Sequence, residues 1–133
     1  MLDFEKGGLF PKAKRAKPGL FEDMVDEFLL PGEEVLGSYK SKHDGVVFTD
    51  RRIIAVGTQG FKVKKKKRKK DCRDITVIPY SKITAFSVES SSSKETDSEL
   101  EIFIADVGTV RVEFVGVSTI RLICKHISEH ILK

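Results

Sequence analysis

The densest group of chemically active side chains is a basic run between residues 61 and 70. It holds eight basic residues and no acidic one: Lys62, Lys64, Lys65, Lys66, Lys67, Arg68, Lys69 and Lys70. Such a run attracts anionic lipid by about 1 kcal/mol per basic residue near the membrane surface, and it neutralises nucleic-acid phosphates with a steep dependence on salt. Because like charges repel one another, a solvated loop that only keeps the protein soluble is the alternative.

Two smaller groups of polar side chains also have spacings that permit chemistry. Arg51 and Arg52 stand beside Asp50, where they could bind an anion or form an ordinary turn network. His126 and His130 are four residues apart, a spacing that can place two imidazoles on one metal ion. No third ligand shares their face, so we expect no metal site.

The sequence indicates no enzyme. It contains no glycine-rich phosphate-binding loop, no nucleophile elbow and no His-Glu pair at metalloprotease spacing. The glutamates that alternate with apolar residues, such as Glu99 and Glu101, are typical of the solvent face of a strand. We therefore expect no catalytic residue, no cofactor and no small-molecule substrate.

Length and composition indicate a single soluble domain. At 133 residues the chain is too short for two ordinary domains, and no apolar run approaches the roughly 20 residues that a membrane helix needs. We expect a cytoplasmic protein, with a peripheral position at the membrane as the alternative. The whole chain has 24 basic and 20 acidic side chains, and eight of the basic ones lie in the run, so its basic character is local.

The stretch from Val46 to Val56 predicts the β-hairpin around which the other elements are arranged. Two runs of β-branched and aromatic residues are separated by Asp50 and Arg51, a polar pair suited to a tight turn. The second run, Ile53–Val56, is apolar on both faces. Each face therefore needs a cover. One cover is the core, and the other is a helix or another chain.

A short amphipathic helix is predicted over residues 20–30, between Pro18-Gly19 and Pro31-Gly32. Its polar face is acidic, which argues against a position on an anionic membrane. The helix either packs on the sheet or contacts a second subunit. The contact residues in the second case, together with two hairpin residues, are Phe21, Met24, Val25, Phe28, Ile53 and Ala55.

The remaining pattern predicts a mainly β fold. Seven strands are expected between Val35 and Phe114, joined by links too short for parallel crossovers. A helix that begins near Val117 or Ser118 carries an apolar stripe and is expected to cap the open end of a bent antiparallel sheet. Residues 1–18 show no sustained periodicity, and we expect a loose basic arm there. Residues 19–133 are expected to form one domain that includes the helix over 20–30.

Two phrases resemble the bacterial pleckstrin-homology-like domain family. The first is Val-Phe-Thr-Asp-Arg-Arg-Ile-Ile over residues 47–54, and the second runs from Ile78 through Pro79-Tyr80-Ser81-Lys82 to Val88. The likeness covers about Pro31 to Lys133. It implies a seven-stranded, strongly bent antiparallel sheet with a C-terminal capping helix. It also implies a non-catalytic binding or scaffolding module that assembles into homo-oligomers through sheet edges.

We therefore expect a module that self-associates through sheet edges or helices. The first alternative is peripheral binding to anionic membrane lipid through residues 62–70. The second alternative, nonspecific binding of nucleic acid through the same residues, is less favoured because only Phe61 supplies an aromatic ring for base stacking.

Overall fold

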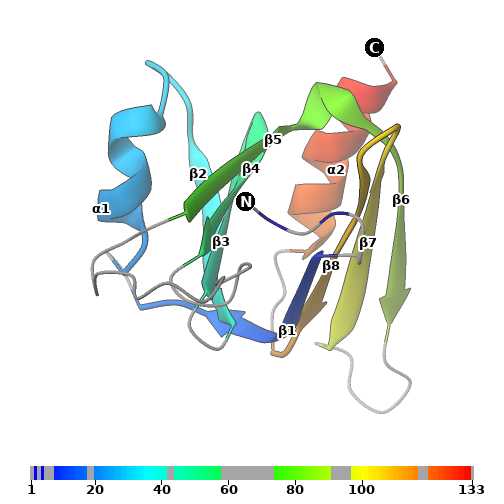
Figure 1. The fold of residues 1–133 in the computed structure, drawn as a ribbon, viewed down its shortest axis with the longest axis horizontal. Coiled ribbons are helices and arrows are strands. Elements are labelled where there is room, and N and C mark those ends of the chain that lie inside the picture. The colour runs from blue at the N-terminus through cyan, green and yellow to red at the C-terminus, as the bar shows by residue number, and fades with distance from the viewer. Residues whose placement is uncertain are drawn as a thin grey trace, which may run out of the picture.

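Eight strands form one strongly curled sheet around a hydrophobic core (Figure 1). The computed structural model describes residues 2, 4, 8–17, 20–41, 44–57, 74–90, 97–116 and 120–132. The order across the sheet is β5-β4-β3-β2-β1-β8-β7-β6. The strands are β1 (Gly8–Arg15), β2 (Val35–Ser41), β3 (Asp44–Thr49), β4 (Arg52–Gly57), β5 (Asp74–Pro79), β6 (Ile83–Ser90), β7 (Ser98–Ile104) and β8 (Gly108–Phe114).

The strand β1 corrects two expectations, the loose arm over residues 1–18 and the purely antiparallel sheet. Its first half pairs parallel with β8, and its second half pairs antiparallel with β2, so it joins the two halves of the sheet. Between the halves the register shifts, and Lys12 has a positive φ of 48°. Phe10 and Ala13 both reach the core although they are three residues apart. This irregularity removes the alternation by which a strand is recognised in a sequence.

The hairpin of β3 and β4 is buried on both faces, as predicted. Ile53 and Ala55 join the main core, where they are 1% and 0% exposed. On the opposite face, Ile54 and Val56 form a second cluster with Phe21 and Val25 from the segment before β2. The second cover is therefore supplied by the same chain.

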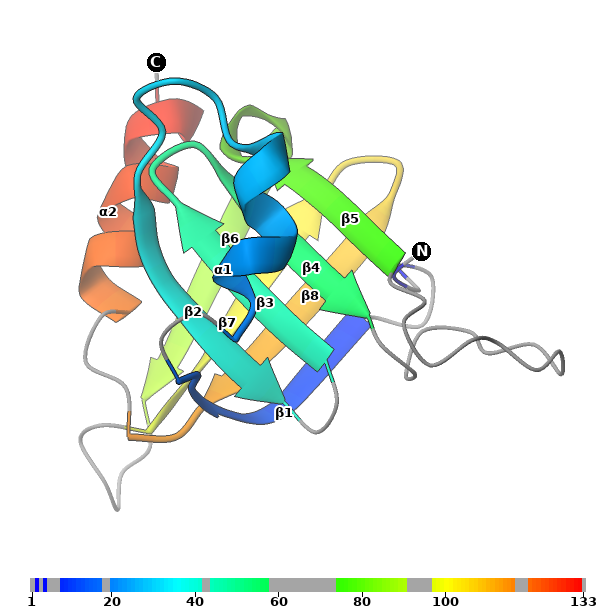
Figure 2. The ribbon, with the colours of Figure 1, turned by 90° about the vertical axis from the view of Figure 1, so that its left-hand side faces the viewer.

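That cover is shorter than the amphipathic helix predicted over residues 20–30, so this prediction was wrong. Only α1 (Glu22–Val25) is α-helical, and it continues into a single 3₁₀ turn, η1 (Asp26–Phe28). Figure 2 shows the segment lying across β3 and β4. Phe21 is 3% exposed, and its ring occupies the space that a Cβ on Gly45 would need, at 2.6 Å. Burial of two apolar anchors holds the segment in place without a long helix.

The helix α2 (Ile120–Ile131) covers the open end of the curled sheet (Figure 1). Ile123 and Ile127 are fully buried in the main core, as the apolar stripe predicts. A second 3₁₀ turn, η2 (Tyr80–Lys82), connects β5 to β6 beneath this helix. The C-terminal cap is thus confirmed, whereas the sheet has eight strands and mixed pairing. Within the described residues, no helix is long and apolar enough to cross a membrane.

Candidate functional site

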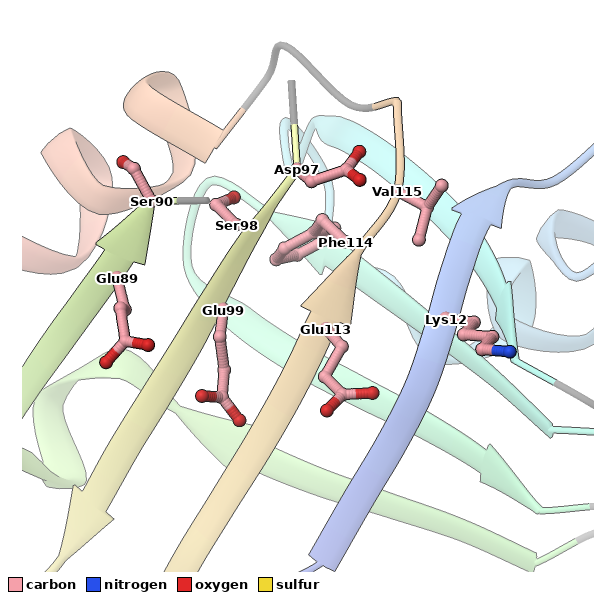
Figure 3. Close-up of a pocket in the computed structure, with 9 residues that line it drawn as sticks. All are labelled: Lys12, Glu89, Ser90, Asp97, Ser98, Glu99, Glu113, Phe114 and Val115. Atoms are coloured by element: carbon pink, nitrogen blue, oxygen red, sulfur yellow. The ribbon is translucent and has the colours of Figure 1, made fainter. Parts of the chain in front are cut away.

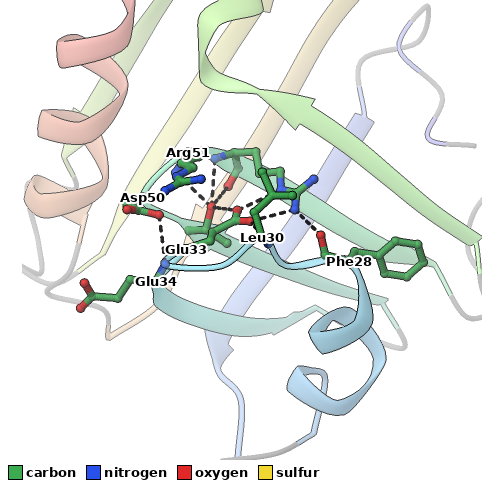
Figure 4. A network of polar contacts seen from close by, with 8 residues as sticks. Phe28, Leu30, Glu33, Glu34, Asp50 and Arg51 are labelled. Atoms are coloured by element: carbon green, nitrogen blue, oxygen red, sulfur yellow. Dashed lines mark hydrogen bonds and ion pairs between the residues drawn. The ribbon is translucent and has the colours of Figure 1, made fainter.

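A buried ion pair attaches the segment before β2 to the β3–β4 hairpin (Figure 4). Arg52 donates through Nη2 to Oε1 of Glu33 at 2.8 Å and through Nε to Oε2 at 2.9 Å. The side chain of Glu33 is fully buried and that of Arg52 is 18% exposed. Two parallel hydrogen bonds between a guanidinium and a carboxylate fix the relative orientation of both groups.

Two further donors complete the surroundings of the Glu33 carboxylate. The hydroxyl of Thr49 donates to Oε2 at 2.7 Å, and the backbone N–H of Leu30 donates to Oε1 at 3.0 Å. Burial alone would raise the pKa of Glu33, but the hydrogen bonds from Arg52, Leu30 and Thr49 lower it from 4.5 to about 2. The carboxylate therefore stays ionised in the folded protein.

The second phrase of the sequence meets the first one at this place. Tyr80 is fully buried, its hydroxyl donates to the carbonyl of Thr49 at 2.6 Å, and its backbone N–H donates to the carbonyl of Arg51 at 3.0 Å. Asp50 accepts from the backbone N–H of Glu34 at 3.0 Å. Burial raises the pKa of Tyr80, so its phenol is protonated and acts as a donor. We call the five residues whose side chains make these hydrogen bonds the hairpin network: Glu33, Thr49, Asp50, Arg52 and Tyr80.

The hairpin network decides between the two interpretations of the paired arginines. The guanidinium of Arg52 is occupied by Glu33 and by the carbonyl of Phe28, so the turn network is correct for this residue. Arg51 is exposed. Arg52 therefore stabilises the fold, and its guanidinium is not available to an anion.

Protonation of Glu33 should make a large contribution to the loss of stability in acid. Because the folded protein lowers the pKa of Glu33 from 4.5 to about 2, this group stabilises the fold above about pH 5 and loses its effect as the pH falls to 2. The gap corresponds to about 3 kcal/mol. Urea unfolding at pH 6 and pH 2.5 should show a smaller loss for Glu33→Gln than for the wild type. Equal losses would contradict this assignment.

Four of the six proposed oligomer contacts are buried inside the single chain. Phe21, Val25, Ile53 and Ala55 are between 0% and 3% exposed. They cannot meet a second subunit unless the chain opens. Ile53 and Ala55 face the main core, whereas Phe21 and Val25 pack against the outer face of the hairpin. Met24 is half-buried, and Phe28 is 42% exposed. Only these two remain at the surface.

The remaining predicted groups are the basic run and the two histidines of the last helix. The basic run Lys62–Lys70 lies outside the described residues. Among the residues that the structure describes, no group of three or more His, Cys, Asp or Glu side chains could hold a metal ion. His130 lies with Nδ1 2.9 Å from the carbonyl of His126, and its ring packs edge-on against Tyr80. His130 is thus part of the contact between α2 and η2, and its ring nitrogen lies against the backbone of His126 in the same helix.

A row of carboxylates on the sheet was not foreseen. Glu89, Glu99 and Glu113 are direct cross-strand neighbours on β6, β7 and β8, and they line a groove of about 250 Å³ (Figure 3). Lys12 lies at the end of this row, and Arg111 lies 3.8 Å from Glu99. Like charges in direct register cost stability. The strand pattern indicated that Glu99 faces solvent, but no sequence signal gave the register across three strands.

The arrangement of strands defines the class of protein. A curled sheet that is closed at one end by a single C-terminal helix is a pleckstrin-homology-like domain. The chain belongs to the family described as "Bacterial PH domain", whose sequence pattern matches residues 6–131. It is 36% identical over 98 residues to "Uncharacterized protein YjqA" of Bacillus subtilis (strain 168), with 74% of this chain and 73% of that protein covered.

Solved structures of bacterial proteins share the fold. A protein with a pleckstrin-homology domain from Shewanella loihica has a TM-score of 0.64 and 23% identity, with 90% of this chain and 97% of that chain covered. A pleckstrin homology domain from Shewanella amazonensis SB2B has a TM-score of 0.55 and 28% identity, with 91% and 93% covered. The family resemblance that the two phrases indicated is therefore confirmed.

Proposed function

We propose that this domain is a non-catalytic binding module that assembles with copies of itself through the free edges of its sheet. Among the described strands, β5 and β6 each have only one neighbour and stand at the two ends of the strand order. Strands at such edges present backbone N–H and C=O groups that can pair with another chain. This pair of open edges is the observation that carries the proposal.

The strand β6 is the better candidate of the two edges. Thr84, Ala85 and all residues from Ser87 to Ser90 are exposed, and Val88 is an exposed apolar residue at 42%. On β5, Val77 is 38% exposed. Because the two edges differ, pairing β5 of one copy with β6 of the next is a head-to-tail contact, whereas pairing β6 with β6 gives a two-fold dimer.

A lysine on the edge should weaken the assembly. Natural edge strands use lysine to block pairing, because a desolvated ammonium opposes the approach of a second strand. We expect Val88→Lys to lower the oligomer's association constant at least tenfold, measured by sedimentation equilibrium. Val107→Lys is the matched control, because Val107 is 46% exposed but lies in the β7–β8 turn.

The result for the second edge completes this test. Val77→Lys places the same charge on β5 and distinguishes a head-to-tail contact, which it weakens, from a β6–β6 dimer, which it leaves unchanged. If neither Val88→Lys nor Val77→Lys alters an oligomer that the wild type forms, assembly through the sheet edges is wrong.

The basic run favours one alternative function, attraction to an anionic membrane surface. Its eight like charges within ten residues are a feature of the sequence, and their effect would be electrostatic rather than that of a shaped pocket. Flotation with vesicles should then increase with anionic lipid and decrease with salt. Nucleic acid would be bound through the same charges without sequence preference.

A further inference from the structure

The strand β6 lacks lysine and proline, two residue types that natural edge strands use against pairing. It is eight residues long, and its single charged residue is Glu89. By contrast, β5 is six residues long and ends in Pro79, which has no backbone N–H to donate. The two edges of the described sheet are therefore unequal. The strand β6, which is the last one in the order (Figure 1), is better suited to pair with a second chain.

Two apolar side chains of β6 are incompletely covered within the single chain. Phe86 and Val88 lie directly opposite Ile102 and Leu100 on β7. Directly opposite residues share a face of the sheet, and Ile102 and Leu100 are fully buried in the main core, so Phe86 and Val88 are on the core side. Nevertheless, Phe86 is only half-buried and Val88 is 42% exposed. A further strand beside β6 would cover both side chains.

We propose that β6 pairs with β6 of a second copy, in a two-fold antiparallel register centred on Ser87. This inference rests on the proposed self-association and specifies the contact through which it occurs. In this register Ser87 lies opposite Ser87 of the second copy, Phe86 lies opposite Val88, and Ala85 lies opposite Glu89. The dimer is closed, because the contact uses the β6 edge of both copies.

The alternation of side chains along a strand limits the registers that this pairing allows. The core sides of both copies must lie on the same side of the joined sheet, so the two-fold axis passes through a residue. A register centred on Phe86 places Val88 beside the irregular start of β6, and a register centred on Val88 places Phe86 opposite Ser90. A register centred on Glu89 opposes two like charges, which costs stability. The register centred on Ser87 avoids this repulsion and pairs the aromatic ring with the β-branched side chain twice.

Cysteine cross-linking tests the register. Directly opposite residues of an antiparallel pair have Cβ atoms about 4.5–5.5 Å apart, which is close to the separation that a disulfide needs. Under mild oxidation, Ser87→Cys should therefore form an intermolecular disulfide at least tenfold faster than Ala85→Cys or Glu89→Cys. These two positions are matched controls, because both are exposed on the same face of β6. Each is displaced from its own copy by four residues along the strand, roughly 14 Å.

A mixture of the two control variants extends the test. Because Ala85 lies opposite Glu89 of the second copy, an equimolar mixture of Ala85→Cys and Glu89→Cys should link the two variants at least tenfold faster than either links to itself. Mass spectrometry identifies the linked residues, and the wild type under the same oxidant gives the background from Cys72 and Cys124.

Equal rates at the three positions, or a faster rate for Ala85→Cys or Glu89→Cys alone, would overturn the register centred on Ser87. Light scattering of the same samples before oxidation distinguishes this failure from failure of self-association itself. A single-chain mass at micromolar concentration would overturn both proposals. An oligomer whose cysteines link without the expected preference would overturn the register and leave self-association through another contact.

Discussion

Replacing Arg52 with methionine should destabilise the fold by about 3–5 kcal/mol, although its side chain is partly exposed. Methionine keeps much of the apolar stem but leaves the buried carboxylate of Glu33 without its cation. It also removes the hydrogen bond from Nη2 to the carbonyl of Phe28. The segment before β2 therefore loses its ion pair with β4, while Phe21 and Val25 still pack against the hairpin. Urea unfolding followed by circular dichroism at pH 7 measures the effect.

The neighbouring arginine is the matched control for this substitution. Arg51 is exposed, so Arg51→Met should change the free energy of unfolding by less than about 0.5 kcal/mol. The double variant Glu33→Gln/Arg52→Met should be more stable than Arg52→Met alone, because no buried charge is then left unpaired. Equal effects of Arg51→Met and Arg52→Met would contradict the role assigned to the hairpin network.

Phe21→Ala should cost a similar amount, about 3–5 kcal/mol. The ring is 3% exposed, and it covers Gly45 and the outer cluster formed by Val47, Ile54 and Val56. Truncation leaves a cavity on the outer face of β3 and β4. Thermal unfolding should show a clear fall in the melting temperature, and the exposed cluster should bind a hydrophobic dye.

Phe28 separates this structural role from a role in assembly. It is 42% exposed, so Phe28→Ala should leave the stability of the single chain nearly unchanged. If the segment before β2 also contacts a second subunit, Phe28→Ala should weaken the oligomer without destabilising the monomer. A loss of stability as large as that of Phe21→Ala would contradict this separation, because it would show that Phe28 contributes to the packing of the single chain.

The parts of the fold predicted from the sequence are those with strong local patterns. The hairpin of β3 and β4 was recognised because its second run is apolar on both faces, and burial on both sides is observed. The strands β7 and β8 alternate strictly, with Leu100 and Val112 buried in register. The stripe of α2 places Ile123 and Ile127 in the core. In each case the local period and the final environment agree.

The parts that the sequence did not predict depend on contacts between distant residues. The strand β1 bends at Pro11 and Lys12 to serve two neighbours, so its inward residues lose the two-residue period. Glu33 stands in a turn of ordinary composition, and its partner Arg52 is 19 residues away. Leu2 and Phe4, which precede β1, belong to the main core, but two separate residues show no period.

The two phrases that identify the family maintain the fold. Thr49, Arg52 and Tyr80 direct their polar groups into the hairpin network, within hydrogen-bond distance of one another or of Glu33. These groups are consequently satisfied inside the chain. The edges of β5 and β6, on which the proposed assembly rests, carry none of these three side chains. One fold can host different sites in this way.

Size-exclusion chromatography with light scattering on the wild-type protein, at low and at high salt, tests the central claim most directly. Assembly through backbone pairing and apolar contacts predicts a discrete oligomer with the same mass at both salt concentrations, since these contacts are not screened by ions. A single-chain mass at micromolar concentration in both conditions would contradict self-association through the sheet edges.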